Sequence, residues 1–173
     1  MKKWDIDTAH SNVFFSIKHM AILNFRGSFS HTHGTVMVDD NDTLASVTAE
    51  IDINSLATRN KERDEHLFKE DFFHLDRYPQ MKFKSKKIVS LGGNKYDVLG
   101  DLTIKNKTKE VKLETTTSQV IKDPYGLHRM VIEASTEINR FDFDVKFDEK
   151  MDNGKVLLGD KVGIKIEMEV THG

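Results

Sequence analysis

The chain has 173 residues, of which 38% are hydrophobic and 31% charged, and its formal net charge at pH 7 is -2. This length suits one domain with a substantial core, and the composition excludes a disordered chain or a membrane-spanning one. The slightly acidic balance argues against a nucleic-acid binder, which would carry a basic excess. Cysteine is absent, so disulfides, thiolate metal sites and a cysteine nucleophile are excluded.

The N-terminus, MKKWDIDTAHSN, lacks the apolar core of a signal peptide. No apolar run in the sequence approaches the length of a membrane helix. We therefore expect a cytoplasmic protein without stable membrane insertion, provided that the natural chain begins at Met1.

Alternating apolar and polar residues predict β-strands over most of the chain. In the first of them, Val13, Phe15 and Ile17 share one face. The predicted strands are 12–18, 25–38, 45–53, one that starts at Met81, 96–104, 110–121, 130–138 and 162–170. Turn residues at 39–42, 92–94 and 123–126 separate several of them. The segment 139–159 is the least regular, with a charged loop around residues 152–154.

One segment, RDEHLFKEDFFHLDRYP at 63–79, departs from this alternation. Its apolar residues Phe68, Phe72 and Leu75 follow a helical spacing, which would place them on one face. We predict a short helical insertion that closes one end of a barrel and forms part of the wall of an apolar cavity.

About eight strands joined by short turns fit either an up-and-down barrel of the lipocalin kind or a two-sheet sandwich. The single helical insertion and the long strands favour the barrel. No repeat, linker or low-complexity tract interrupts the chain, so residues 1–173 are predicted to form one domain. The predicted fold is therefore an all-β, eight-stranded antiparallel barrel with one short helical insertion.

Short motifs along nearly the whole chain resemble those of the YceI-like family in order and spacing. They are Trp4-Asp5-Ile6-Asp7, His10-Ser11, Ile17-Lys18-His19, Gly27-Ser28-Phe29, Arg63-Asp64-Glu65-His66-Leu67, Asp71-Phe72-Phe73, Tyr78-Pro79, Phe83-Lys84-Ser85, Gly100-Asp101-Leu102-Thr103-Ile104, Asn139-Arg140 and Leu158-Gly159-Asp160. The family pattern usually has glycine where Asn106 and Asp144 stand. The resemblance implies a lipocalin-like barrel that holds a polyisoprenoid or another lipid tail, and it implies binding or sequestration, with no catalytic residues.

The residues that we expect to contact such a ligand come from the predicted strands and the helical insertion. They are Phe15, Ile17, His19, Met20, Phe29, Leu67, Phe68, Phe72, Phe73, Met81, Phe83 and Arg140. His19 and Arg140 are the candidates for a polar head group, since arginine suits a phosphate. The alternative is a filled barrel, because eight strands enclose either packed side chains or one small ligand.

No cofactor is expected besides the bound isoprenoid-type lipid. A fatty acid or fatty amide in the same cavity is an alternative ligand, and an enzyme acting on a lipid is opposed by the lack of a nucleophile motif. Arg63 and Asp64 are expected to fix the helical insertion to the barrel, not to form a charge relay with His66. The sequence leaves a homodimer possible. Lys82, Lys84 and Lys86 form an outward-facing strip that could make transient contact with a membrane, although a solvated strand face is the simpler interpretation of this strip.

His31 and His33 form an His-x-His pair on one strand face. A zinc site would need a third ligand, for which His10, His19 and His74 are the candidates. Nothing in the sequence requires that ligand, so we expect no metal site.

Overall fold

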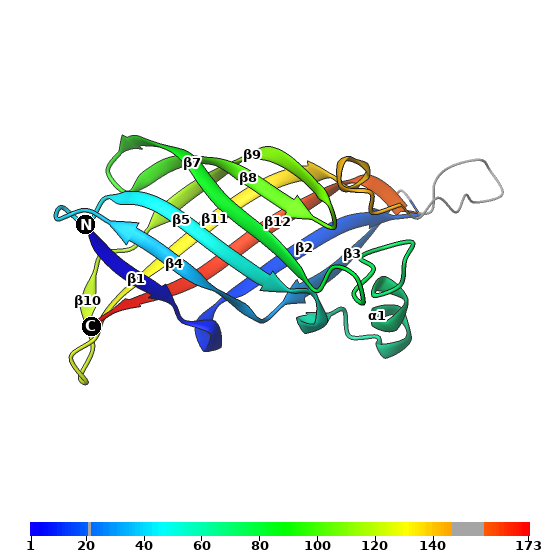
Figure 1. Ribbon diagram of the computed structural model, residues 1–173, viewed down its shortest axis with the longest axis horizontal. Helices are drawn as coiled ribbons and strands as arrows, with labels where there is room; N and C mark the ends of the chain where they lie inside the picture. Colours follow the sequence, from blue (N-terminus) through cyan, green and yellow to red (C-terminus); the bar gives the residue numbers. More distant parts are fainter. Residues whose placement is uncertain (21, 147–157) are drawn as a thin grey trace.

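The computed structural model describes residues 1–20, 22–146 and 158–173. Within these residues, the strands form one antiparallel sheet that closes as an eight-stranded barrel (Figure 1). Closure comes from β11 (His128–Asn139) and β12 (Leu158–His172), which pair from His128 opposite His172 to Asn139 opposite Lys161. The predicted all-β antiparallel barrel is confirmed, and the sandwich alternative is wrong.

Three of the eight barrel strands are interrupted, and each consists of two successive short strands. These pairs are β1 (Lys2–Ile6) with β2 (Asn12–His19), β3 (Leu23–Phe29) with β4 (Thr32–Val38), and β5 (Leu44–Asp52) with β6 (Leu56–Ala57). The 3-10 turns η1 (Thr8–His10) and η2 (Ile53–Ser55) separate the members of the first and third pairs. The other strands are β7 (Gln80–Gly92), β8 (Lys95–Ile104), β9 (Lys107–Thr117) and β10 (Ile121–Lys122).

The prediction of one unbroken strand over 25–38 is wrong. The chain leaves the ladder at residues 30–31 because β3 pairs with β2 and β6, whereas β4 pairs with β1 and β5. Strand β1 was not predicted, and β9 begins at residue 107, three residues before its predicted start at 110. The charged loop predicted around residues 152–154 lies outside the described residues.

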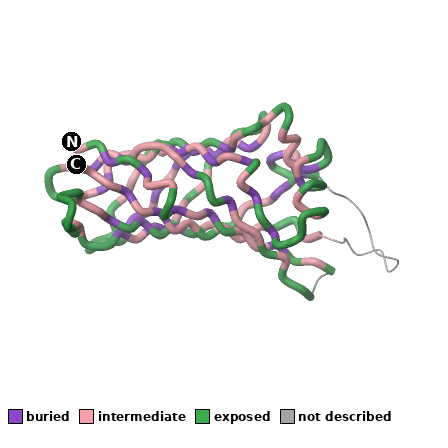
Figure 2. The backbone as a smooth tube through the Cα atoms, turned by 90° about the horizontal axis from the view of Figure 1, so that it is seen from below, coloured by how far each residue is buried: buried purple, intermediate pink, exposed green. Residues whose placement is uncertain are grey.

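The period-two pattern places the predicted apolar faces inside the barrel. Val13 and Ile17 are buried, while Phe14 between them is 37% exposed. Buried and less buried positions alternate along β8 in the same way, and Figure 2 shows buried positions distributed along the barrel. The hairpin turn predicted at 92–94 is also confirmed, with Gly92 and Gly93 at φ of 96° and 60°, which glycine adopts readily.

The helical insertion is shorter than predicted. Helix α1 spans Lys61–Leu67 only, and its first turn is capped by the Asn60 side chain, which accepts from the Arg63 amide at 3.1 Å. Beyond it the chain runs through turns: the Phe73 amide donates to the Leu67 carbonyl at 3.0 Å, and His74 takes a left-handed φ of 53°. The predicted helix through Phe68, Phe72 and Leu75 is therefore wrong, although the segment still covers one end of the barrel, opposite the chain termini (Figure 1).

Asn106 and Asp144, the two positions that replace a usual glycine, differ in backbone conformation. Asp144 takes a left-handed φ of 57°, the conformation that glycine adopts without strain. In the other turn, Lys105 and not Asn106 has the positive φ, also 57°. No helix within the described residues has the length and apolar character needed to cross a bilayer.

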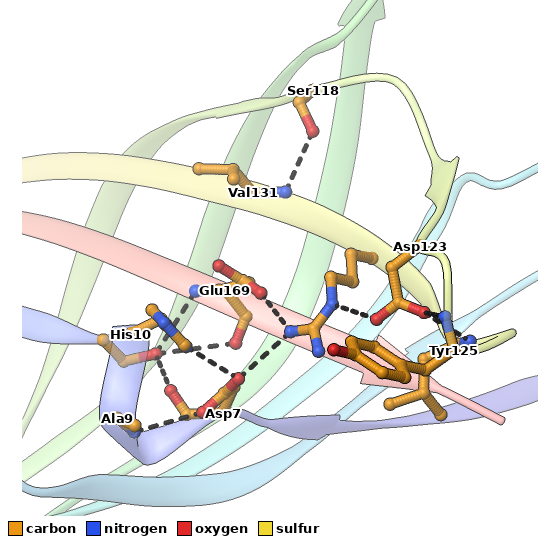
Figure 3. A network of polar contacts seen from close by, with 11 residues as sticks. Asp7, Ala9, His10, Ser118, Asp123, Tyr125, Val131 and Glu169 are labelled. Atoms are coloured by element: carbon orange, nitrogen blue, oxygen red, sulfur yellow. Dashed lines mark hydrogen bonds and ion pairs between the residues drawn. The ribbon is translucent and has the colours of Figure 1, made fainter.

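Polar contacts hold together the region where the first and last strands meet (Figure 3). The Arg129 guanidinium donates to Asp123 Oδ2 at 2.7 Å and to Asp7 Oδ2 at 3.2 Å, and it also contacts Glu169. His10 lies 3.0 Å from the same Asp7 oxygen. Hydrogen bonds from His10 and Arg129 hold the pKa of Asp7 below its usual value, and Arg129 does the same for the pKa of Asp123.

Candidate functional site

An apolar cavity of about 100 Å³ lies inside the barrel at the end covered by the helical insertion. Its wall combines strand residues with residues of the insertion and of the 3-10 turn η3 (Arg140–Phe143). The lining residues are Val13, Phe15, Ile17, Phe25, Phe29, Leu67, Phe72, Phe73, Met81, Ile104, Ile138, Arg140, Phe143, Val145, Leu158, Val162 and Ile164. Arg140 is the only titratable side chain among them.

A second cavity of about 100 Å³ lies next to the first, between strands of the barrel body. Val13, Met81, Ile104 and Ile164 line both cavities and so form the boundary between them. Methionine has three rotatable side-chain bonds and adapts to irregular spaces, so Met81 is the most adaptable part of this boundary. The barrel interior is therefore partly hollow along its length and not completely filled by side chains.

Several phenylalanine rings in the wall of the first cavity contact one another. The Phe29 ring lies 5.6 Å from that of Phe15 and 5.7 Å from that of Phe73, the latter edge-on. These centroid distances are in the range where aromatic pairs attract one another. Opposite Phe15, β3 carries Gly27, where a Cβ would lie within 3 Å of Thr58 Cγ2 and of the Phe15 ring. The Phe15 ring therefore occupies space that a side chain at position 27 would otherwise fill.

The helical insertion is fixed to the barrel through Thr58, as expected for Arg63 and Asp64. Asp64 Oδ1 accepts from the Thr58 amide at 3.0 Å and also contacts the Thr58 hydroxyl. Arg63 Nε donates to the same hydroxyl at 2.9 Å, and the guanidinium lies 4.3 Å from the centre of the Phe25 ring on β3. The anchoring interpretation is confirmed, and these two side chains are engaged with the fold.

Two cationic side chains, Arg140 and Lys105, lie near the end of the first cavity that the helical insertion covers. Arg140 is buried and donates to the backbone carbonyls of Gly159 at 2.7 Å, Val145 at 3.0 Å and Leu158 at 3.2 Å. Lys105 Nζ donates to the carbonyl of Asp144 at 2.8 Å, and burial lowers the pKa of the Lys105 ammonium. Arg140 and Lys105 thus tie η3 to its surroundings and place positive charge beside the apolar wall.

The structure brings most of the expected ligand-contacting residues into the two cavities. Phe15, Ile17, Phe29, Leu67, Phe72, Phe73, Met81 and Arg140 line the first cavity, and Met81 and Phe83 line the second. Three expected residues lie outside both linings: His19, Met20 and Phe68. Met20 is 44% exposed, and Phe68 packs against the core from the insertion.

Several lining residues were not expected from the sequence. Phe25 and Val162 follow the same period-two pattern as their strand neighbours, so their inward phase was available as a signal. Phe143 and Val145 belong to η3 and the residues after it, where the sequence has no regular pattern. Only the fold shows that this irregular segment turns its apolar side chains inward.

Polar groups inside the second cavity are few. The Thr115 hydroxyl donates to the Leu113 carbonyl at 3.0 Å. The Thr32 hydroxyl oxygen is buried and has no hydrogen-bond partner within the described residues. It is an unsatisfied donor and acceptor in a predominantly apolar wall.

A closed antiparallel barrel with adjoining apolar cavities defines the class of β-barrels whose interior can enclose a small apolar ligand. The chain belongs to the YceI-like family, because the model of the YceI-like domain matches residues 4–170.

Individual relatives agree with this assignment. A UPF0312 protein of Staphylococcus epidermidis is 33% identical over 171 residues, covering 98% of this chain and 97% of the relative. The crystal structure of BcnA from Burkholderia cenocepacia is similar with a TM-score of 0.82 at 29% identity, covering 95% of this chain and 98% of BcnA. A domain from Saccharophagus degradans, described as polyisoprenoid-binding, has the same fold with a TM-score of 0.73 at 12% identity, covering 98% of both chains.

Proposed function

We propose that this protein binds an amphiphilic, isoprenoid-like lipid inside the barrel and stores, carries or sequesters it. The observation that carries the proposal is the pair of adjoining apolar cavities whose boundary is formed by Val13, Met81, Ile104 and Ile164. The description of the Saccharophagus degradans domain as polyisoprenoid-binding supports the same class of ligand for a barrel of this fold.

The size of the cavities sets the form of the ligand. Each cavity, at about 100 Å³, is smaller than the roughly 150 Å³ cavity that suffices for benzene. Burying a five-carbon prenyl unit contributes roughly 3–4 kcal/mol, whereas association costs about 4–15 kcal/mol. A tightly bound chain therefore needs several units, and these fit only if the chain spans both cavities and Met81 moves aside.

The polar end of the ligand is assigned to the end of the barrel under the helical insertion. Arg63, Lys105 and Arg140 carry positive charge around this end. A phosphate or another anionic head group there would be attracted by these cations, while the tail entered the apolar wall. The second cavity is the farther of the two from the insertion and would hold the end of the tail.

Binding is favoured over catalysis by the chemistry of the lining. Among the described residues of both cavities, Arg140 is the only titratable side chain, and no carboxylate or imidazole stands next to a threonine hydroxyl. A nucleophile without a nearby base is weakly reactive, so the lining supplies contact surface and no acid–base pair.

The direct test is to extract the purified full-length protein with organic solvent and to analyse the extract by mass spectrometry. A prenyl chain supports the proposal, and a fatty acid or fatty amide identifies the alternative ligand in the same cavity. An empty extract, together with no saturable uptake of a fluorescent prenyl probe, contradicts binding of either kind.

A pair of adjacent phenylalanines gives a matched variant test. Phe15 lines the first cavity, whereas Phe14 on the same strand faces outward. We expect Phe15→Asp to weaken probe uptake at least about tenfold, since a carboxylate in an apolar wall is costly. Phe14→Asp should leave uptake unchanged at equal folded fraction. Val13→Phe, which fills the boundary without adding charge, should also weaken uptake, and equal uptake by all three variants would contradict the cavity assignment.

A further inference from the structure

Two histidines and a carboxylate gather on the outer face of the barrel where β3 gives way to β4. His31 and His33 alternate with the inward-facing Thr32, and Asp52 lies at the end of the neighbouring strand β5. One potential ligand atom from each of His31, His33 and Asp52 lies within 4.8 Å of the others. None of the third ligands considered from the sequence (His10, His19 and His74) takes part.

The backbone explains how Asp52 reaches this position. Thr32 pairs with Ile51 and His33 with Glu50, so the next residue of β5 comes level with His31. The Asp52 amide donates to the His31 carbonyl at 3.0 Å, which fixes this register at the end of the ladder. His33 and Asp52 therefore stand on paired strands, and His31, in the link between β3 and β4, is held to Asp52 by this hydrogen bond.

Neighbouring side chains orient the potential ligands. Gln80 Nε2 donates to Asp52 Oδ1 at 2.9 Å, while Asp52 Oδ2 contacts His31 Nδ1. Glu50 Oε2 lies 3.1 Å from His33 Nε2. Glu50 lies opposite Lys82 of β7 in the strand register, and its carboxylate holds the His33 ring. A hydrogen-bonded imidazole and a hydrogen-bonded carboxylate are typical of oriented metal ligands.

We propose that His31, His33 and Asp52 form a binding site for a divalent transition-metal ion of the Zn²⁺ class. Two imidazoles and one carboxylate are ligands that Zn²⁺ accepts, and water can take the fourth position. In a tetrahedral site the ligand atoms lie roughly 3.5 Å apart. The His31 and His33 side chains are partly exposed, which leaves room for them to rotate toward such a geometry.

A second cluster of similar composition makes the assignment specific. Asp7, His10 and Glu169 also offer ligand atoms within 4.8 Å of one another. There, however, the Arg129 guanidinium donates to both Asp7 and Glu169 (Figure 3). A metal ion would have to displace a cation that already neutralises these carboxylates, so this cluster serves as the control.

The metal site is independent of the lipid proposal, because its ligands lie on the outside of the barrel wall. A bound metal ion would link the segment between β3 and β4 to the end of β5. Phe29, which lines the first cavity, lies two residues before His31. Metal binding to the folded state alone raises its stability by mass action.

The test uses the full-length protein after removal of metals with a chelator. Calorimetric titration with ZnCl₂ should show one equivalent bound, and CoCl₂ should give the visible absorption bands of four-coordinate cobalt. At 100-fold excess of Zn²⁺ over Kd, the Tm should rise by about 5–10 °C. Absence of saturable Zn²⁺ binding by the unaltered protein would overturn the proposal.

Variants locate the site. His33→Asn and Asp52→Asn should each lower Zn²⁺ affinity at least tenfold and abolish the cobalt bands, and Gln80→Ala should lower affinity by about 10–100-fold through loss of ligand orientation. His10→Asn, in the control cluster, should bind as tightly as the unaltered protein. Unchanged affinity in His33→Asn, with circular dichroism showing an intact fold, would also overturn the proposal. So would an equal loss in His10→Asn.

Discussion

At the scale of single residues, two of the buried threonines line the second cavity and differ in their hydrogen bonds. Thr32 and Thr115 both line the second cavity and are 1% and 5% exposed. The Thr115 hydroxyl donates to the Leu113 carbonyl, whereas the Thr32 hydroxyl has no partner among the described residues. A buried hydroxyl without a hydrogen bond opposes folding, while a paired one contributes modestly.

Substituting each threonine by valine should therefore change stability in opposite directions. Thr32→Val removes an unpaired hydroxyl and should raise the free energy of unfolding by about 1 kcal/mol, whereas Thr115→Val should lower it by a similar amount. Urea unfolding of both variants at neutral pH measures the two differences. A loss of stability in Thr32→Val would show that its hydroxyl is hydrogen-bonded in solution, to water or to a ligand in the second cavity.

At the scale of elements, the helical insertion covers the barrel end with apolar side chains and is hydrogen-bonded at its start. Its apolar residues Leu67, Phe72 and Phe73 reach into the first cavity, and the Asp64 carboxylate holds Thr58 at the start of the segment. Short helices are marginal by themselves, so α1 depends on these tertiary contacts. Loosening the anchor should therefore affect the cap before it affects the barrel.

We expect Asp64→Ala to increase amide hydrogen exchange in residues 61–75 while leaving the barrel strands unchanged. The buried Thr58 amide and hydroxyl lose their acceptor, which costs about 1–3 kcal/mol and favours local opening of the cap. Mass spectrometry of exchanged peptides measures this effect. Asp71→Ala is the control, since Asp71 is exposed and contacts His66 only at the surface. Equal exchange in both variants would show that Thr58 is not the anchor.

The sequence predicted elements correctly where the alternation of apolar and polar residues alone determines the structure. Strand faces such as Val13, Phe15 and Ile17 were predictable because a half-buried strand needs no other information. The helical spacing of Phe68, Phe72 and Leu75 predicted a helix, but the backbone beyond Leu67 runs through turns instead. The gap at 30–31 and the meeting of Asp52 with His31 depend on which strands pair, and that is a property of the whole sheet.

At the scale of the whole molecule, the first and last strands share only a short ladder at the end of the barrel where the chain termini lie. β1 pairs with β12 through two residue pairs, Asp5 with Thr171 and Ile6 with Val170. Arg129 of β11 reinforces this short seam by binding Asp7, Glu169 and Asp123 together. Charge pairing therefore supports the barrel wall where β1 and β12 share few residue pairs, and its contribution depends on the ionisation of those carboxylates.

Replacing Arg129 by methionine should make the pH dependence of stability shallower on the acid side. The folded-state pKa values of Asp7 and Asp123 are lowered, so their contribution is present above the ordinary value near 4 and is lost as pH falls through the lowered pKa values. His10, whose pKa is raised by Asp7, contributes in the opposite sense, below its usual value near 6.5. His10 remains in the variant.

The midpoint of urea unfolding should therefore differ most between Arg129→Met and the unaltered protein near neutral pH, and the difference should shrink below about pH 4. Arg26→Met, at an exposed position of β3, should shift the midpoint little at any pH, and a gap for Arg129→Met that stays constant with pH would contradict the role of these carboxylates.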